Sequence, residues 1–218
     1  MLPFRSDRVL EPSLSTKLVS DCVGDCNGQR VLIVGSGAGL LPIRCALSGG
    51  LVTAIDIEPE AVCLTRQNAG ALDAEVKVEE RDFWRMSNVR NDWDVIASNP
   101  PQQPSRKLPS NGSWSQHAHY GGQFGLEFIC GLIGFAEKGL SPRGRFVCSI
   151  FSFLRDEIWM ECALKHGFTW SLQASAKKRK GPVTRKNMLR CPHGYREDSL
   201  SDPDYEIRVY TFQSGGTH

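Results

Sequence analysis

The sequence lacks the features that mark membrane, secreted and disordered proteins. Its longest apolar runs, Val31–Val34 and Ile129–Ala136, are far shorter than the roughly 20 residues that cross a bilayer. Near its start the chain carries Arg5, Asp7 and Arg8 rather than an apolar segment behind a basic one, so no secretory signal is expected. Hydrophobic residues form 40% of the 218 residues, which is too many for a mainly disordered chain. The length suits a single domain.

The sequence also lacks the cysteine spacings typical of metal centres. Among its eight cysteines, Cys22 and Cys26 are the only close pair, and they belong to no Cys-x-x-Cys motif and no zinc-type quartet. Five others lie in apolar segments and are expected to be small core residues: Cys45, Cys63, Cys130, Cys148 and Cys162. We therefore expect reduced thiols, no metal and a cytoplasmic location.

The net charge excludes little, but the charges are unevenly distributed. The chain has 26 basic and 24 acidic residues, a formal net charge of +2. Seven of the basic residues fall within Lys177–Arg190, which contains no acid. This basic segment suits the phosphates of an RNA or an acidic protein face, and equally a solvated loop or lid. A phosphate-bearing partner is therefore one expectation for this segment.

Short apolar runs alternate with amphipathic segments along most of the chain. The runs predict strands at 31–34, 51–55, 76–78, 95–97, 145–151, 168–172 and 207–212. The amphipathic segments predict helices at 39–47, 60–72, 126–138 and 156–165. Strands that alternate with helices through short connections form a doubly wound, mostly parallel α/β sheet. A long polar segment without a clear helix precedes the last of the seven strands, so an antiparallel last strand is expected.

These elements divide the chain into two parts. Residues 29–218 are expected to form one domain, with a polar insertion or lid at 173–205. Residues 1–28 are expected to form an N-terminal segment on the substrate side. In open sheets of this kind, ligands bind beyond the carboxyl ends of the strands. The loops after Val34, Ile55, Val78 and Ala97 are therefore expected to hold the site.

A glycine-rich loop joins the first strand to its helix. Its sequence is Gly35-Ser36-Gly37-Ala38-Gly39, and glycines let a ligand approach the backbone N–H groups at a helix N-terminus. The third glycine falls at 39 and Leu at 40, a spacing that differs from the dinucleotide-binding loop and suits a ligand without a pyrophosphate. Asp56 closes the second strand, where a carboxylate can accept both hydroxyls of a ribose. A plain turn, and a helix cap at 56–59, are the alternatives.

Two more motifs follow the third and fourth strands. Asp82 and Phe83 suit an exocyclic amine and the face of an adenine, although an ordinary loop acid would have the same sequence. Asn99-Pro100-Pro101 follows the fourth strand, and its prolines stiffen the loop. The Asn99 side-chain oxygen and the Pro100 carbonyl can then grip an NH2 group through both hydrogens. Acceptors set for a pyramidal nitrogen favour the geometry in which its lone pair attacks. A rigid turn without chemistry is the alternative.

Over residues 9–172 these motifs resemble class I S-adenosylmethionine-dependent methyltransferases, specifically the amino-methylating group with Asn-Pro-Pro and an aromatic residue. Release-factor glutamine methyltransferases belong to this group, and Tyr120–Leu126 is similar to their Gly-Gly-x-x-Gly-Leu turn. The resemblance implies a Rossmann-like fold and S-adenosylmethionine as cofactor. It implies cofactor contacts from the strand-end loops, at Gly35, Ser36, Gly37, Gly39, Asp56, Ile57, Asp82, Phe83 and Asn99. It implies that the target nitrogen is held by the catalytic residues Asn99, Pro100 and Pro101.

Three positions depart from the pattern of that group. Ile33 replaces an acid before the glycine loop, Ser13 replaces an arginine of an early Pro-Arg segment, and Gln102 replaces the aromatic residue. Gln102 is expected to hydrogen-bond the substrate. The missing aromatic face is expected from another loop, with candidates Phe83, Trp84, Trp114 and Tyr120, of which Trp114 and Tyr120 are placed on the substrate side. His117 and His119, in the same polar loop, are expected to be exposed or to contact substrate.

The expected function is transfer of a methyl group from S-adenosylmethionine to an amide or exocyclic amine nitrogen of a protein or RNA. A biosynthetic methyltransferase for a small-molecule amine is the alternative within this class. Two other classes share parts of the pattern: a nicotinamide-dependent oxidoreductase and a non-catalytic cofactor-binding subunit. Leu40 and the Asn-Pro-Pro loop argue against the oxidoreductase.

Overall fold

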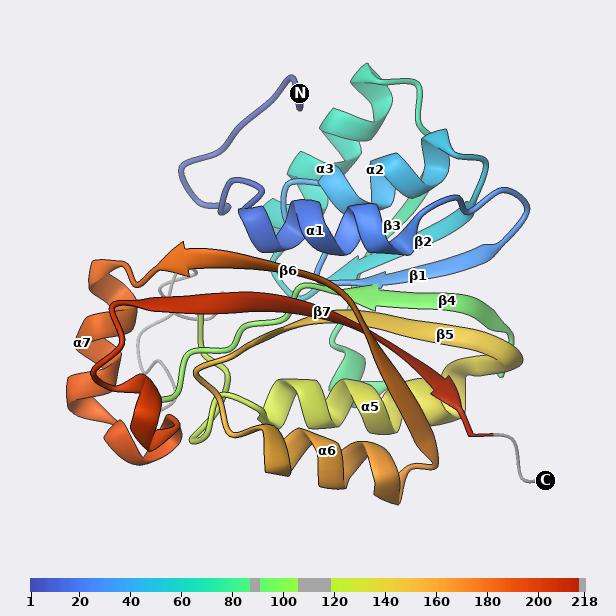
Figure 1. The fold of residues 1–218 in the computed structure, drawn as a ribbon. Helices are drawn as coiled ribbons and strands as arrows, with labels where there is room; N and C mark the ends of the chain where they lie inside the picture. Colours follow the sequence, from blue (N-terminus) through green and yellow to red (C-terminus); the bar gives the residue numbers. More distant parts are fainter. Residues whose placement is uncertain (87–90, 106–118, 216–218) are drawn as a thin grey trace.

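The computed structural model describes residues 1–86, 91–105 and 119–215, and these contain a central seven-stranded sheet (Figure 1). Its strands are β1 (Arg30–Val34), β2 (Leu51–Asp56), β3 (Val76–Glu80), β4 (Trp93–Ser98), β5 (Leu140–Phe151), β6 (Phe168–Arg179) and β7 (Asp204–Ser214). Their order across the sheet is β3-β2-β1-β4-β5-β7-β6. β1 to β5 run parallel, whereas β7 pairs antiparallel with both β5 and β6. The predicted mostly parallel sheet with an antiparallel last strand is confirmed.

Helices cover both faces of this sheet. α1 (Leu14–Val23), α2 (Leu40–Leu47) and α3 (Pro59–Ala71) lie on one face, and α5 (Glu127–Gly139) and α6 (Asp156–Lys165) on the other (Figure 1). Successive strand side chains point to opposite faces, so neighbouring residues join different cores. Ile96 and Phe146 belong to the core that contains residues of α5 and α6. Val95 and Val147 belong to the core that contains residues of α1 and α2.

The N-terminal residues include a helix that the sequence analysis did not predict. The hydroxyl of Ser13 caps α1 by accepting a hydrogen bond from the Thr16 backbone N–H (3.3 Å). The buried face of α1 is made of small residues, Ser15, Val19, Ser20 and Val23. Because two of these four are serines, the apolar period that marks a helix is weak.

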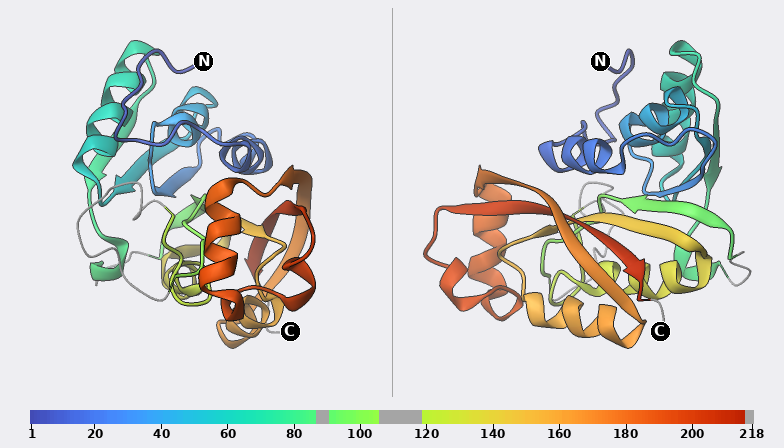
Figure 2. Two further views of the ribbon diagram at one scale, coloured as in Figure 1. Left: turned by 90° about the vertical axis from the view of Figure 1, so that its left-hand side faces the viewer. Right: turned by 45° about the vertical axis from the view of Figure 1, so that its right-hand side comes forward.

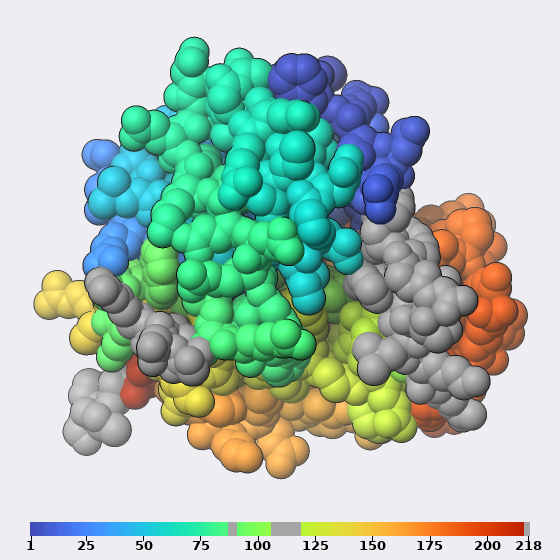
Figure 3. Space-filling model, turned by 180° about the vertical axis from the view of Figure 1, so that it is seen from behind, coloured from blue at the N-terminus to red at the C-terminus, as the bar shows by residue number. Residues whose placement is uncertain are grey.

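Before α1 the chain runs along α3. The Phe4 backbone N–H donates to Asn68 Oδ1 (2.8 Å), and Asn68 Nδ2 donates to the Phe4 carbonyl (3.2 Å). Ser6 Oγ donates to Glu60 Oε1 (2.9 Å). Figure 3 shows this dark blue segment against the cyan surface of α3. These hydrogen bonds hold the part of the chain that leads into α1.

The C-terminal part differs from its prediction in three ways. β5 begins at Leu140, earlier than predicted. The sixth strand was predicted to end at 172, but β6 continues to Arg179 because it pairs with β7 along its length, with an irregularity between Leu172 and Ala174. β6 is an edge strand and largely exposed, so it carries polar residues, and its sequence therefore resembles that of a loop. A further helix, α7 (Pro182–Arg190), follows where none was predicted, at the far end of β6 and β7 (Figure 2).

Neither a membrane-crossing helix nor a metal-binding cluster is present in the part of the chain that the structure describes. No helix there is long and apolar enough to span a bilayer. Within the same residues, no three His, Cys, Asp or Glu side chains gather as ligands of a metal ion. The eight cysteines are free thiols.

Candidate active site

The glycine loop leaves β1 through backbone conformations that favour glycine. Gly35, Gly37 and Gly39 have φ values of 84°, 55° and 96°, all in the left-handed region. The backbone N–H groups of Gly35 and Ser36 donate to the Ile55 carbonyl (2.9 and 3.1 Å), which ties the loop to the end of β2. A Cβ atom at Gly35 or Gly37 would meet nothing within 4 Å, so open space lies beside this part of the loop.

Asp56, at the end of β2, is hydrogen-bonded to the same loop. Its Oδ2 accepts from the Gly37 backbone N–H (2.9 Å) and the Ser36 hydroxyl (3.4 Å), and its Oδ1 accepts from the Glu58 backbone N–H (3.1 Å). Burial raises the pKa of Asp56, and the backbone N–H donors partly offset that rise. The carboxylate is therefore fixed beside the loop and keeps lone pairs for a ligand.

Asp82 and Phe83 lie just beyond the end of β3, and both side chains contact other parts of the protein. Asp82 Oδ1 accepts from the Trp84 backbone N–H (3.0 Å) and so begins a short helix, η1 (Phe83–Arg85). Phe83 is buried and packs against Phe128 of α5, with 4.7 Å between ring centroids. The adenine contacts expected of Asp82 and Phe83 stay a prediction.

The Asn99 side chain forms hydrogen bonds to two elements that lie far from it in the sequence, β5 and α1. Its Oδ1 accepts from the Ser149 hydroxyl of β5 (2.8 Å), and its Nδ2 donates to Thr16 Oγ1 of α1 (3.0 Å). Ser149 is fully buried. Sequence reasoning identified Asn99 but neither of these partners, which are 50 and 83 residues away along the chain.

Gln102 points into the protein. Its Nε2 donates to the Pro100 carbonyl (3.3 Å) and to Ser149 Oγ (3.2 Å), and its Oε1 accepts from the Phe151 backbone N–H (2.9 Å). The residue is only 2% exposed. These bonds connect the Asn-Pro-Pro loop to the end of β5. The hydrogen bond to substrate expected of Gln102 stays a prediction, and the side chain has a clear internal role.

A cavity of about 430 Å³ brings the glycine loop and the Asn-Pro-Pro loop together. This volume falls within the range of small-molecule sites, roughly 300–1,000 Å³. The predicted residues that line it are Gly35, Ser36, Gly37, Asp56, Ile57, Asn99, Pro100, Pro101 and Gln102. Four others are not in its lining: Gly39, Asp82, Phe83 and Tyr120. Trp114 and His117 lie outside the described residues.

Two segments outside the strand-end loops complete the cavity wall. One is the N-terminal stretch from Arg8 to Thr16, and the other is the tip of β6 with the start of α7, including Lys178, Arg179 and Thr184. Both lie within the ranges predicted as a substrate-side segment (1–28) and a lid (173–205). Figure 2 shows that α7 closes one end of the β6–β7 pair.

Aromatic side chains reach the cavity from elements that the sequence analysis did not single out. Phe128 of α5, Phe151 of β5 and Tyr205 of β7 line it. The Phe151 and Tyr205 rings meet edge to face, with 5.3 Å between centroids. His119 also lines the cavity, and burial lowers its pKa, which favours the neutral imidazole.

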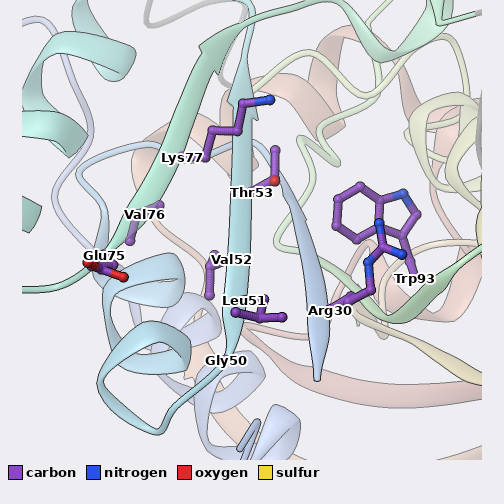
Figure 4. Close-up of a pocket in the computed structure, with 9 residues that line it drawn as sticks. All are labelled: Arg30, Gly50, Leu51, Val52, Thr53, Glu75, Val76, Lys77 and Trp93. Atoms are coloured by element: carbon purple, nitrogen blue, oxygen red, sulfur yellow. The ribbon is translucent and has the colours of Figure 1, made fainter. Parts of the chain in front are cut away.

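A second hollow, of about 550 Å³, lies at the opposite ends of the strands (Figure 4). It is open and is formed by β1 to β4, with Arg30, Leu51, Val76 and Trp93 in its wall. The Arg30 guanidinium lies 5.8 Å from the centroid of the Trp93 ring and pairs with Asp92 (2.8 Å). None of the predicted strand-end motifs lines this hollow. The candidate site is therefore the cavity at the carboxyl ends of the strands.

The comparisons with known proteins agree on one class. The family model of the methyltransferase small domain matches residues 11–112. The chain is 33% identical over 136 residues to a putative protein N5-glutamine methyltransferase of Methanocaldococcus jannaschii, an alignment that spans 60% of this chain and 68% of that protein. It is 32% identical over 127 residues to a release factor glutamine methyltransferase of Deinococcus radiodurans, spanning 56% of this chain and 45% of that one.

A ribosomal RNA relative and a solved structure extend the comparison. The chain is 31% identical over 147 residues to ribosomal RNA small subunit methyltransferase C of Chromohalobacter salexigens, which spans 67% of this chain and 39% of that protein. The chain thus spans less than half of the release-factor and ribosomal RNA enzymes. A putative RNA methyltransferase of Pyrococcus horikoshii shares the fold with a TM-score of 0.59 and 16% identity, covering 98% of this chain and 89% of that one.

Fold, site and relatives together define a Rossmann-like, S-adenosylmethionine-dependent methyltransferase of class I. The chain belongs to the methyltransferase small-domain family within that class. Its cofactor is S-adenosylmethionine. The cavity fits that cofactor, because the open space beside Gly35 and Gly37 and the Asp56 carboxylate lie in one lining.

Proposed function

We propose that this enzyme methylates an amide or exocyclic amine nitrogen of a protein or RNA, and that a glutamine side chain of a protein is the first candidate. The observation that carries the proposal is the shared cavity. The two acceptors of the Asn-Pro-Pro loop and the glycine loop with Asp56 line the same 430 Å³ space. A methyl donor bound at the glycine loop can therefore face an amino group held by the Asn-Pro-Pro loop.

The cofactor side of this proposal uses the ends of β1 and β2. The backbone beside Gly35 and Gly37 would accommodate the methionine part, and Asp56 would accept the ribose hydroxyls. Ile57 and Phe128 would contact the adenine, since both line the cavity. Gly39 would act indirectly, because it lets the loop pack against α3. When bound, S-adenosylmethionine supplies an electrophilic methyl carbon on its sulfonium.

The acceptor side uses Asn99 and Pro100. Asn99 Oδ1 and the Pro100 carbonyl would each accept one hydrogen of the target NH2 group, and Pro101 stiffens the loop. The lone pair of an amide nitrogen is delocalised, so the nitrogen is a poor nucleophile. Two fixed acceptors favour the pyramidal geometry in which the lone pair can attack, and this lowers the barrier rather than tightening substrate binding. The proton can leave to water after methylation.

The glutamine candidate is supported by the names of the relatives and by the aromatic lining. The relatives of M. jannaschii and D. radiodurans are named for glutamine methylation. Phe151 and Tyr205 add aromatic ring surface to the cavity that the acceptor loop lines, and a planar carboxamide can pack against it.

Transfer of labelled methyl from S-adenosylmethionine to three acceptor sets tests this proposal. The sets are glutamine-containing peptides and release factors, bulk RNA, and small amines. Label in protein that is released as N5-methylglutamine on digestion supports the first candidate. Label in small amines alone would contradict the macromolecular assignment, and cofactor binding without transfer to any set would contradict the enzymatic role of Asn99.

RNA is the second candidate, favoured by the basic residues at the end of β6 and on α7. Lys178 and Arg179 are exposed, line the cavity, and form no ion pair with any residue in the described ranges. Lys186 and Arg190 are exposed on the adjacent α7. Unpaired cations beside the acceptor site suit the phosphates of a nucleic acid that presents its base to Asn99.

Charge reversal separates the two candidates. If RNA is the acceptor, Lys178→Glu with Arg179→Glu raises KM for RNA at least tenfold and lowers its salt dependence. Lys165→Glu, an exposed lysine at the end of α6 and outside the cavity lining, is the matched control and leaves KM unchanged. If a protein glutamine is the only acceptor, RNA neither takes up label nor inhibits, and the RNA candidate fails.

A further inference from the structure

A chain of hydrogen bonds runs behind the Asn-Pro-Pro loop, and its direction can be assigned. It starts at the Phe151 backbone N–H, which can only donate, and this group donates to Gln102 Oε1 (2.9 Å). The oxygen and nitrogen ends of the Gln102 amide are thereby distinguished. Its Nε2 end must face Ser149 Oγ (3.2 Å) and the Pro100 carbonyl (3.3 Å).

The same logic continues to Asn99. The Gln102 Nε2 group can only donate, so Ser149 Oγ accepts from it. The Ser149 proton is then free to be donated to Asn99 Oδ1 (2.8 Å). The Asn99 Nδ2 group consequently points to Thr16 Oγ1 (3.0 Å). One backbone N–H thus sets the direction of every later bond up to Thr16.

We propose that Gln102 is a positioning residue that fixes the orientation of the Asn99 amide through Ser149. The proposal rests on the function proposed above, in which Asn99 Oδ1 accepts a hydrogen of the target NH2. An Asn99 amide rotated by half a turn would present Nδ2 donors to those hydrogens and repel them. Gln102 thereby has an internal role at the position where the resembling group has an aromatic residue.

Burial makes this positioning effective. Gln102 is 2% exposed and Ser149 is fully buried, so water does not compete for their hydrogen bonds. Gln102 also holds the Pro100 carbonyl, the second proposed acceptor. The carbonyl has two lone pairs, and the Gln102 bond uses one, so the other remains for the target. Both acceptors are therefore oriented by the same side chain.

The variant Gln102→Glu tests the direction of the chain by pH. A protonated glutamic acid keeps one donor beside its acceptor, one donor fewer than glutamine, and can still donate to Ser149 Oγ, whereas a carboxylate only accepts. When the carboxylate forms, the Ser149 proton turns toward it and leaves Asn99 Oδ1. With the acceptor found in the labelling experiment, we expect kcat of Gln102→Glu to be highest at low pH and to fall at least tenfold as pH rises. The Kd of S-adenosylmethionine stays within twofold throughout.

Ser149 must transmit this effect. In the double variant Gln102→Glu/Ser149→Ala, the pH step is expected to vanish and kcat to be low at all pH values. The control is Ser152→Ala, which removes a hydroxyl that accepts from the Glu206 backbone N–H (2.8 Å) just after β5, and which leaves the pH profile of the native enzyme unchanged. A pH step that persists without the Ser149 hydroxyl, or an equal loss at every pH in Gln102→Glu alone, would overturn the proposal.

A measurement without turnover separates this proposal from the proposed function. With asparagine labelled by ¹⁵N, the Asn99 side-chain amide is assigned by its loss in Asn99→Asp. We expect its hydrogen exchange to be slow in the native enzyme and at least fivefold faster in Ser149→Ala and Gln102→Met. Equal exchange in all three proteins refutes the positioning role whether or not methyl transfer is observed. If no acceptor set takes up the labelled methyl group but the hydrogen exchange behaves as expected, only the proposed function is refuted.

Discussion

Replacement of Asn99 by alanine separates catalysis from cofactor binding. Asn99 supplies one of the two proposed acceptors for the target NH2 group, and an electrostatic contact aimed at the transition state is worth about 2.7–4 kcal/mol, or roughly 10²–10³ in kcat. Within the described residues, the Asn99 side chain forms hydrogen bonds to Ser149 and Thr16 and none to the glycine loop or Asp56. We therefore expect kcat to fall by two to three orders of magnitude while the Kd of S-adenosylmethionine changes less than about threefold.

The same substitution has a structural cost that must be measured separately. Loss of the Asn99 oxygen leaves the buried Ser149 hydroxyl without that acceptor, which costs about 1–3 kcal/mol of stability. Trp159→Phe is the matched control, because Trp159 is also fully buried, its Nε1 donates to Asp156 Oδ1 (2.9 Å), and it lies outside the cavity lining. It should lose similar stability in urea denaturation with kcat nearly unchanged.

Three measurements are made on each variant: Kd by calorimetry, kcat by methyl transfer at saturating cofactor, and stability by urea denaturation. An Asn99→Ala enzyme that loses cofactor affinity in proportion to kcat would assign the residue to the structure of the cofactor site. An enzyme with unchanged kcat would remove it from the chemistry altogether.

Three further predictions concern groups around the cavity. Burial raises the pKa of Asp56, so cofactor affinity should weaken as pH falls through a value above the ordinary 3.8, because the protonated acid loses acceptor capacity. Calorimetry measures this affinity, and the same pH step in Asp56→Asn would refute the prediction. Gly39→Ala should lower the free energy of unfolding by about 1–3 kcal/mol in thermal denaturation, since φ is 96° and the new Cβ would lie 3.1 Å from Ile43 Cδ1. The control Gly70→Ala lies in α3 beside open space and should raise that free energy by up to about 1 kcal/mol. Equal effects of the two substitutions would contradict the strain at Gly39. Lys180→Met should lower the free energy of unfolding by about 1–3 kcal/mol and speed proteolysis near α7, because the buried Lys180 ammonium donates to the backbone carbonyls of Ser199 and Asp202. Unchanged cleavage would show that Lys180 does not anchor the region around α7.

The centre of the parallel half of the fold follows from the sequence because β1 and β4 are buried on both faces. Val31–Val34 and Val95–Ala97 are continuous apolar runs, and glycine or proline follows each strand end, so both the strands and their loops are visible. The antiparallel edge is less visible, because an exposed strand such as β6 needs few apolar residues and its pairing with β7 spans a distant segment. Helix α1 is hidden for a related reason, since its buried face includes Ser15 and Ser20.

The candidate site divides along the same line. The glycines, Asp56 and Asn99 lie in local motifs that the sequence shows, and each of these loops lines the cavity. Phe83 fits a local pattern equally well, yet it packs into the core against Phe128, because hydrophobic burial of a large ring outweighs what the neighbouring acid suggests. The internal role of Gln102 depends on Ser149, 47 residues away, and no local pattern reveals such a partner.

A structure of the enzyme with S-adenosylhomocysteine would show where the cofactor lies relative to Asn99. We expect ribose hydroxyls on the Asp56 carboxylate and the sulfur facing Asn99 Oδ1 and the Pro100 carbonyl across the 430 Å³ cavity. A nucleoside bound instead in the hollow beside Arg30 and Trp93, or a sulfur directed away from Asn99, would contradict it.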